Sequence, residues 1–238
     1  MKKYLNRIIE FFYPSKKIIQ TDYKKKLISL NAYEKYKDEE MEKCYNYFKK
    51  HFKSSIFLSS DRIREYALKK SLQKDLNQNH FYLEFGVYVG KSINIFASNL
   101  KTKIYGFDSF EGLNEDWVGH ARSSGHLDLK GITPKVRDNV VLVKGEVEQT
   151  LVKFLEEKKP VINFMHIDLD TYNPSKFVLY HTKKYMAKGA IILFDDFYNF
   201  TGWDVGELKA LEEVYNFDEY KYLAFSKDGS QGCKKKKN

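Results

Sequence analysis

From residue 81 onward, short apolar segments alternate with amphipathic segments. The apolar segments are typical of buried strands, and the segments between them have helical spacing. The predicted strands are Phe81–Phe85, Ile104–Phe107, Val140–Val143, Val161–Ile167 and Ala190–Phe194. The predicted helices are Lys91–Asn99, Val147–Glu157, Ser175–Met186 and Val205–Tyr215. Strands that alternate with helices form a parallel sheet covered on both faces, which binds ligands beyond the carboxyl ends of its strands.

Two of the predicted strands end in aspartates. The fourth strand runs into Asp168 and Asp170, and the fifth runs into Asp195 and Asp196. Because these strand ends are neighbours in a parallel sheet, up to four carboxylates meet there and raise each other's pKa. A hard divalent cation such as Mg²⁺, which prefers oxygen ligands, would offset this repulsion. Helix caps and salt bridges are the alternative roles for these acids, and the participation of Asp170 stays open.

The first predicted strand leads into a glycine-containing turn. Glu84 precedes Gly86, Gly90 stands before the next helix, and Ser92 lies in the first turn of that helix. The Gly-x-x-x-Gly spacing fits neither the dinucleotide fingerprint nor a Walker loop. An acid just before the glycines suits a ligand that presents an amino group rather than phosphates. A plain β–α turn is the alternative.

Further candidates follow the second and third predicted strands. Asp108 ends the second strand, where a carboxylate accepts hydrogen bonds from ribose hydroxyls in related folds. A helix cap or an Asx turn is the alternative for Asp108. Gly145 and Glu146 begin the turn after the third strand, where an adenine would lie. Together these residues describe an adenosine pocket without a phosphate cradle, which fits S-adenosylmethionine better than ATP or NAD.

The positive charge of the chain is concentrated at its ends. The formal net charge is +9, and residues 1–80 contain 19 basic and 10 acidic residues. Residues 81–238 contain 22 of each, and four of these basic residues are Lys234–Lys237. Only five of the 41 cations are arginines, so no nucleic-acid partner is expected.

Composition excludes several other classes of protein. No apolar segment approaches the roughly 20 residues of a membrane span, and no signal peptide is visible. Cys44 and Cys233 lack metal-ligand spacing and indicate a reducing compartment. We therefore predict a cytoplasmic protein without a transmembrane segment.

Several blocks of the sequence resemble class I S-adenosylmethionine-dependent methyltransferases, specifically the macrocin O-methyltransferase (TylF-like) family. The resemblance runs from about Ile56 to Tyr222. The Asp-Ser-Phe-x-Gly-Leu block at residues 108–113 is far more specific than a glycine loop. The other blocks are Tyr82–Ser92, Val143–Leu151, His166–Tyr172 and Phe194–Phe197.

The resemblance implies an α/β fold, a Rossmann-like three-layer sandwich. Its mostly parallel, seven-stranded sheet would have the order 3-2-1-4-5-7-6. The family ends in an apolar seventh strand, whereas this chain ends in lysines, so strand seven is left open. We assign residues 1–55 to a basic helical N-terminal extension, 56–230 to the methyltransferase domain and 231–238 to a basic tail.

The resemblance also assigns roles to the candidate residues. Asp168, Asp195 and Asp196 would bind the metal, and Asp168 would be the general base. The residues assigned to S-adenosylmethionine are Glu84, Gly86, Gly90, Ser92, Asp108, Ser109, Gly145 and Glu146. His120 and His126 lie in a Gly- and Ser-rich loop, residues 119–131, that is expected to cover the substrate.

The function predicted from the sequence is Mg²⁺-assisted methyl transfer to a hydroxyl of a sugar or another polyhydroxylated small molecule or glycan. One alternative is a methyltransferase that acts on a catechol-like or phenolic acceptor. Another is a non-catalytic protein of the same fold that binds nucleic acid or a membrane through its basic N-terminal region. The oligomeric state, including a homodimer, is left open.

Overall fold

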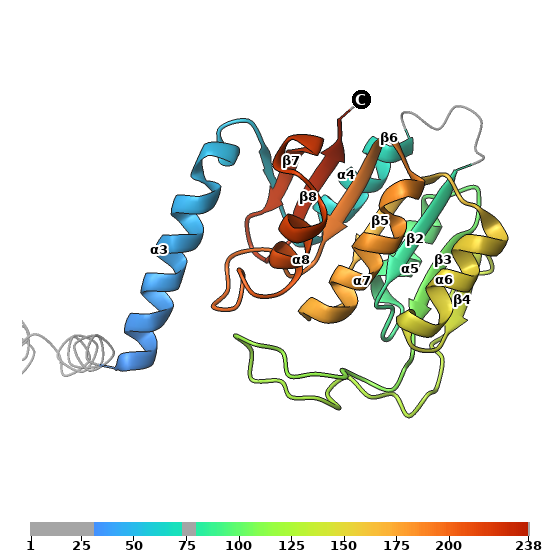
Figure 1. Ribbon diagram of the computed structural model, residues 1–238, viewed down its shortest axis with the longest axis horizontal. Helices are drawn as coiled ribbons and strands as arrows, with labels where there is room; N and C mark the ends of the chain where they lie inside the picture. Colours follow the sequence, from blue (N-terminus) through green and yellow to red (C-terminus); the bar gives the residue numbers. More distant parts are fainter. Residues whose placement is uncertain (1–30, 73–79, 238) are drawn as a thin grey trace, which may run out of the picture. The chain divides into compact units, whose positions relative to one another are not determined.

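The computed structural model describes residues 31–72 and 80–237 (Figure 1). The chain divides into two compact units, residues 1–43 and 44–238. This division falls inside helix α3 (Ala32–Phe52), so the domain boundary at residue 55 stays a prediction. Residues 1–30 of the helical extension expected at residues 1–55 lie outside the described residues. No helix in the described ranges is long and apolar enough to cross a membrane.

The second unit is built on an eight-stranded sheet with the order β1-β7-β8-β6-β5-β2-β3-β4. Every neighbouring pair is parallel except the two pairs that β8 makes. Seven strands therefore follow the predicted order, and the short β1 extends the edge beside β7. The strands are β1 (Ile56–Leu58), β2 (Phe81–Phe85), β3 (Ile104–Asp108), β4 (Val140–Lys144), β5 (Ile162–Ile167), β6 (Met186–Phe194), β7 (Tyr220–Ser226) and β8 (Gly232–Lys236).

Helices cover both faces of this sheet, as predicted for a three-layer sandwich. One face carries α4 (Ser60–Leu72) and α5 (Lys91–Ser98). The other face carries α6 (Val147–Lys158), α7 (Tyr172–Thr182) and α8 (Glu207–Val214) (Figure 1). Two short 3₁₀ helices, η1 (Lys183–Tyr185) and η2 (Phe217–Glu219), precede β6 and β7.

The central strands are apolar throughout because each face of the sheet packs on its own core. Ile191 and Leu193 of β6 belong to the core beneath α4 and α5. Ile192 and Phe194, the alternate residues, belong to the core beneath α6, α7 and α8. Successive side chains of a strand point to opposite faces, so a strand buried on both faces lacks polar alternation.

The lysine-rich C-terminal segment forms a strand within the sheet. Residues 231–238, expected as a basic tail, include β8, which lies antiparallel between β6 and β7. Cys233 is fully buried, and Lys234 is only 6% exposed. The Lys234 ammonium lies 4.1 Å from the centroid of the Tyr222 ring. The seventh strand of the expected order is therefore β8, and it forms although three of its five residues are lysines, because lysine stems pack along apolar and aromatic surface.

Candidate active site

The carboxyl ends of β2, β5 and β6 bring the predicted acidic residues together. Phe85 of β2 pairs with Ile167 of β5, which in turn pairs with Phe194 of β6. The Asp168 amide donates to the Phe85 carbonyl at 2.9 Å, and the Asp195 amide donates to the Ile167 carbonyl at 2.9 Å. Backbone pairing thus continues past each strand and places both aspartates at one edge of the sheet.

Three carboxylates converge at this edge and form what we call the acidic cluster: Asp168, Asp195 and Asp196. Each offers one oxygen, and these oxygens lie within 4.8 Å of one another. Burial and the charge of Asp195 raise the pKa of Asp168 well above its usual range. The same two causes raise the pKa of Asp196 to about 6. The repulsion expected from the sequence is present, and the oxygen donors suit a hard divalent cation.

Asp195 differs from the other two acids because cationic and polar side chains hold it. Arg64 of α4 forms an ion pair with its Oδ1 atom, and the Gln231 Nε2 atom donates to the same oxygen at 3.1 Å. The His166 Nε2 atom lies 3.5 Å from it. Burial raises the pKa of Asp195, but His166 and Arg64 outweigh this effect and lower the pKa to about 2. Asp195 is therefore an ionised carboxylate, and among the described residues no donor hydrogen-bonds its Oδ2 atom.

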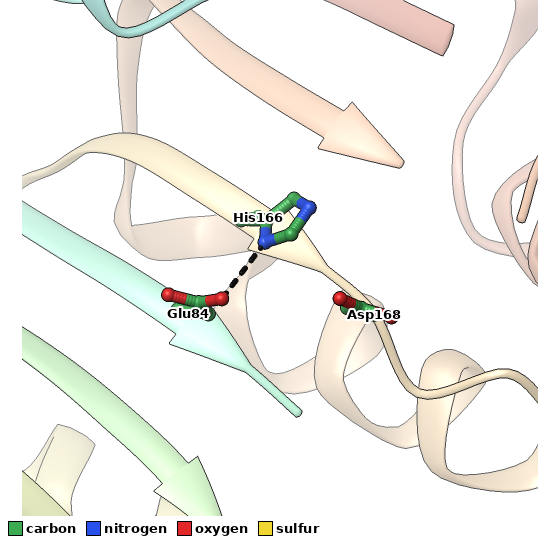
Figure 2. A group of neighbouring side chains, drawn as sticks. All are labelled: Glu84, His166 and Asp168. Atoms are coloured by element: carbon green, nitrogen blue, oxygen red, sulfur yellow. Dashed lines mark hydrogen bonds and ion pairs between the residues drawn. The ribbon is translucent and has the colours of Figure 1, made fainter. Parts of the chain in front are cut away.

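His166 connects the acidic cluster to the first strand of the predicted cofactor site. Its Nδ1 atom lies 3.1 Å from Glu84 Oε1 (Figure 2). The same Glu84 oxygen also accepts a hydrogen bond from the Ser92 hydroxyl. Burial lowers the pKa of His166, but hydrogen bonds with Asp195 and Glu84 raise it to about 9. A buried, protonated histidine thus lies between two carboxylates. Glu84 is completely buried and Ser92 nearly so, which places both behind the wall of the cavity described below.

Asp108 closes the loop between β2 and α5. Its Oδ2 atom accepts hydrogen bonds from the amides of Val87 and Tyr88, each at 2.7 Å. Its Oδ1 atom accepts from the Phe110 amide at 2.6 Å. The carboxylate therefore fixes two turns at once, an Asx turn after β3 and the glycine turn after β2.

The glycine turn after β2 passes directly against the acidic cluster. Gly86 has φ +87°, a left-handed conformation that favours glycine. A Cβ atom at this position would lie 1.7 Å from the carbonyl oxygen of Asp168. Only glycine lets the two backbones approach this closely.

These elements surround a cavity of about 630 Å³. It is lined by part of the predicted cofactor set and by the complete acidic cluster. The predicted residues that line it are Gly86, Asp108, Ser109, Glu146, Asp168, Asp195 and Asp196. The predicted residues outside the lining are Glu84, Gly90, Ser92 and Gly145. Asp170 also lines the cavity, with a pKa raised well above its usual range by burial and by Asp168.

A further wall of the cavity comes from the segment around the loop that was expected to cover the substrate. His120 lines the cavity together with Trp117 and Arg122, whereas His126 is not part of the lining. Of the two candidate histidines, only His120 lines the cavity.

Two residues that support the acidic cluster were missed by the sequence reasoning. Arg64 lies on α4, 131 residues before its partner Asp195, and no local pattern connects them. Glu207 is fully buried at the start of α8. Its two carboxylate oxygens accept hydrogen bonds from the amides of Leu169, at 3.3 Å, and Asp196, at 3.2 Å. The only sequence signal for Glu207 was an acid in the first turn of the helix predicted at Val205–Tyr215.

Comparison with known families agrees with this geometry. Residues 83–197 match the family described as "Methyltransferase domain". The match begins in β2 and ends directly after the acidic cluster. Residues 83–197 are a methyltransferase domain. This confirms the methyltransferase prediction for the part of the chain that builds most of the cavity.

Solved structures that resemble the chain extend the likeness beyond the methyltransferase domain. The crystal structure of CalS11, a calicheamicin methyltransferase, has a TM-score of 0.59 and 25% identity, covering 71% of this chain and 77% of CalS11. Its apo structure, described as a TDP-rhamnose 3'-O-methyltransferase of calicheamicin biosynthesis, has a TM-score of 0.55 and 24% identity, covering 74% and 77%. The O-methyltransferase NovP has a TM-score of 0.55 and 14% identity, covering 75% and 80%, which shows the fold alone. No curated protein matches the sequence.

Proposed function

We propose that the protein transfers a methyl group from S-adenosylmethionine to a hydroxyl of a sugar or another polyhydroxylated small molecule, assisted by a divalent cation. One observation carries the proposal: a single cavity is lined both by predicted cofactor residues and by the acidic cluster. The TDP-rhamnose acceptor in the description of CalS11 supports a sugar acceptor.

The cofactor occupies the wall formed after β2, β3 and β4. Asp108, Ser109 and Glu146 line this wall and offer acceptors for ribose hydroxyls and polar adenine edges. Gly86 keeps the backbone free of side-chain bulk where the wall meets the acidic cluster. S-adenosylmethionine supplies an electrophilic methyl group, so the protein needs to provide alignment and a deprotonated acceptor oxygen.

The acidic cluster prepares the acceptor. Asp168, Asp195 and Asp196 would hold a divalent cation, which supplies Lewis-acid chemistry that lowers the pKa of a hydroxyl. Asp195 is ionised in advance by His166 and Arg64, so it can bind a cation without first losing a proton.

Asp168 accepts the proton of the acceptor hydroxyl while the oxygen bonds to the methyl carbon and the bond from that carbon to sulfur breaks. Asp168 lines the cavity, where its carboxylate can take up the proton of a bound hydroxyl. Asp170 is the second candidate for this role, because it lines the same cavity. The pH dependence of turnover in Asp168→Asn and Asp170→Asn distinguishes the two carboxylates: the base variant loses the acidic limb of the profile.

The experiment has two stages. Calorimetry first measures binding of S-adenosylmethionine to the full chain, and an absence of binding at high protein concentration would refute the proposal. Methyl transfer to a panel of sugars and catechols is then measured with Mg²⁺, with EDTA, and with Mg²⁺ restored after EDTA. We expect methylated sugars and a loss of turnover in EDTA that Mg²⁺ reverses. Products from catechols alone would instead favour the phenolic-acceptor alternative.

A further inference from the structure

A short hairpin carries an aromatic and cationic surface that lines the cavity together with the acidic cluster. Trp117 and Arg122 form an antiparallel bridge, in which the Trp117 amide donates to the Arg122 carbonyl at 3.0 Å. The rings of Trp117 and His120 have centroids 4.0 Å apart, and the Arg122 guanidinium lies 4.8 Å from the Trp117 ring centroid. All three side chains line the cavity, and we call them the Trp117–His120–Arg122 surface.

This hairpin is fixed to the loop that follows β6. A Cβ atom on Gly119 would lie 2.3 Å from the Gly202 backbone nitrogen, so the two backbones are in direct contact. The Thr201 hydroxyl donates to the Gly119 carbonyl at 2.8 Å, and the rings of His120 and Phe200 are 5.0 Å apart. The surface is therefore a positioned wall of the cavity.

Among the described residues, Arg122 is the single lysine or arginine that lines the cavity, which also contains many acidic residues. Its positive charge partly offsets the rise in the pKa of Asp196, but within the described ranges its guanidinium forms no ion pair within 4.0 Å and no hydrogen bond. Other lining acids already have protein partners, since Glu115 binds Asn173 and Glu146 accepts from Asn114. The donors of Arg122 are thus available, and a planar guanidinium matches phosphate and carboxylate oxygens in a bidentate geometry.

The neighbours of Arg122 suit a sugar ring. Trp117 lines the cavity although it is only 6% exposed, and its buried Nε1 donor has no hydrogen-bond partner in the described part of the chain. Partial burial and the charge of Arg122 lower the pKa of His120, so its imidazole is neutral at pH 7. A neutral imidazole both donates and accepts, as a hydroxyl-rich ligand requires.

We propose that the acceptor carries an anionic group, a phosphate or a carboxylate, which Arg122 binds while the sugar packs against Trp117. The inference rests on the proposed function, because it names the acceptor class of the same cavity. A nucleotide-linked or phosphorylated sugar would supply the phosphate, and a uronic acid would supply the carboxylate. A neutral sugar would leave Arg122, the one lysine or arginine among the described lining residues, without an anionic ligand.

The test compares matched charged and neutral probes. Calorimetry on the full chain, saturated with S-adenosylhomocysteine, measures the affinities of glucose 1-phosphate against methyl glucoside, TDP-rhamnose against rhamnose, and glucuronate against methyl glucoside. We expect at least one charged probe to bind about ten- to a hundredfold more tightly than its neutral counterpart, as charge-assisted hydrogen bonds provide. The pair of probes that shows the preference identifies whether Arg122 binds a phosphate or a carboxylate group.

Variants assign the preference to one residue. Arg122→Gln should abolish the preference while S-adenosylhomocysteine affinity is retained, and Arg122→Lys should keep part of it, because lysine lacks the planar fork. Arg137→Gln is the matched control, since Arg137 lies outside the lining, and it should leave the preference unchanged.

Equal affinities for every pair, or a preference that survives Arg122→Gln, overturns the inference. Neither result tests the proposed function. That function fails if the protein binds no S-adenosylmethionine or methylates no hydroxyl. Efficient methylation of neutral sugars combined with equal affinities would establish the function and reject the anionic acceptor.

Discussion

Two walls of the cavity accommodate negative charge in different ways. On the wall formed after β2, β3 and β4, which is the proposed cofactor wall, Asp108 accepts three backbone hydrogen bonds, and the carboxylate is part of the loop structure. In the acidic cluster, Asp168 and Asp196 are buried beside other carboxylates, and burial and repulsion raise their pKa. The negative charge of Asp108 is thus balanced by backbone donors, whereas the acidic cluster holds repulsion that a bound cation would relieve.

Removing one acid from the cluster should have the largest effect. Asp168→Asn should reduce turnover by about 10²- to 10⁴-fold, because an amide cannot take up the acceptor's proton. The affinity for S-adenosylmethionine, measured by calorimetry, should change little. In EDTA the variant should unfold at a higher temperature than the native protein, because one repelling charge is gone. A lower unfolding temperature would show that Asp168 is stabilising and that the contrast between the walls is wrong.

The junction of the two walls depends on Gly86. Gly86→Ala should lower the free energy of unfolding by about 2–5 kcal/mol, since it combines left-handed strain with a backbone clash at Asp168. Urea denaturation measures this change. Gly125→Ala is the matched control, because Gly125 has φ +81° and no atom lies within 4 Å of the place its Cβ would take. The control should cost about 1–2 kcal/mol, and equal costs would show that Asp168 moves aside freely.

A variant of Glu207 tests how far the acidic cluster depends on the hydrogen bonds that Glu207 accepts from the Leu169 and Asp196 amides. Glu207→Gln replaces one of the two acceptors with an amide donor, so one of the amides of Leu169 and Asp196 loses its partner. We expect affinity for Mn²⁺, measured by calorimetry, to fall about ten- to a hundredfold, as for residues that orient metal ligands. Glu213→Gln, on the same helix and half-exposed, is the control. Unchanged Mn²⁺ affinity in Glu207→Gln would show that the two loops hold their shape unaided.

Lys234 is a buried basic residue outside the cavity lining, and its burial is expected to lower the stability of the folded protein. Burial lowers its pKa to about 7, from an ordinary value of 10.5. Between these values the unfolded chain binds more protons than the folded one, so stability rises with pH above about 7. Lys234→Met should stabilise the protein by roughly 1–2 kcal/mol at pH 6–7, with a smaller gain at pH 9. A gain that does not shrink between pH 6 and 9 would show that titration of Lys234 is not the cause.

The sequence predicted the central strands well because their signal is local. The apolar runs before Gly86, Asp108 and Asp168 correspond to β2, β3 and β5 within one residue at their carboxyl ends. The acids that follow them were placed at one edge because parallel strands align their carboxyl ends. The sequence leaves the C-terminal strand open, because Lys234–Lys237 gives no apolar pattern and the burial of Lys234 depends on aromatic neighbours from other elements.

The division of roles among the candidate residues required the tertiary structure. Glu84 and Ser92 belong to the predicted cofactor set by position, yet both lie behind the cavity wall, where Glu84 pairs with His166. Arg64 and Arg122 are two of the five arginines, and only the fold brings them to the cavity region. Whether the individual residues bind cofactor or metal stays a prediction.

Strand periodicity and strand-end residues, which are encoded within a few positions, determined the central parallel strands and the edge where the acids gather. The order of the strands came from the resemblance to a known family and not from local periodicity. Only the tertiary structure decided which carboxylates are paired, which are repelled by neighbouring carboxylates, and which cationic side chain is available to a ligand. These properties depend on distances between side chains far apart in the chain, such as Arg64 and Asp195. Electrostatic energy varies with those distances and with burial, and the local sequence encodes neither the distances nor the burial.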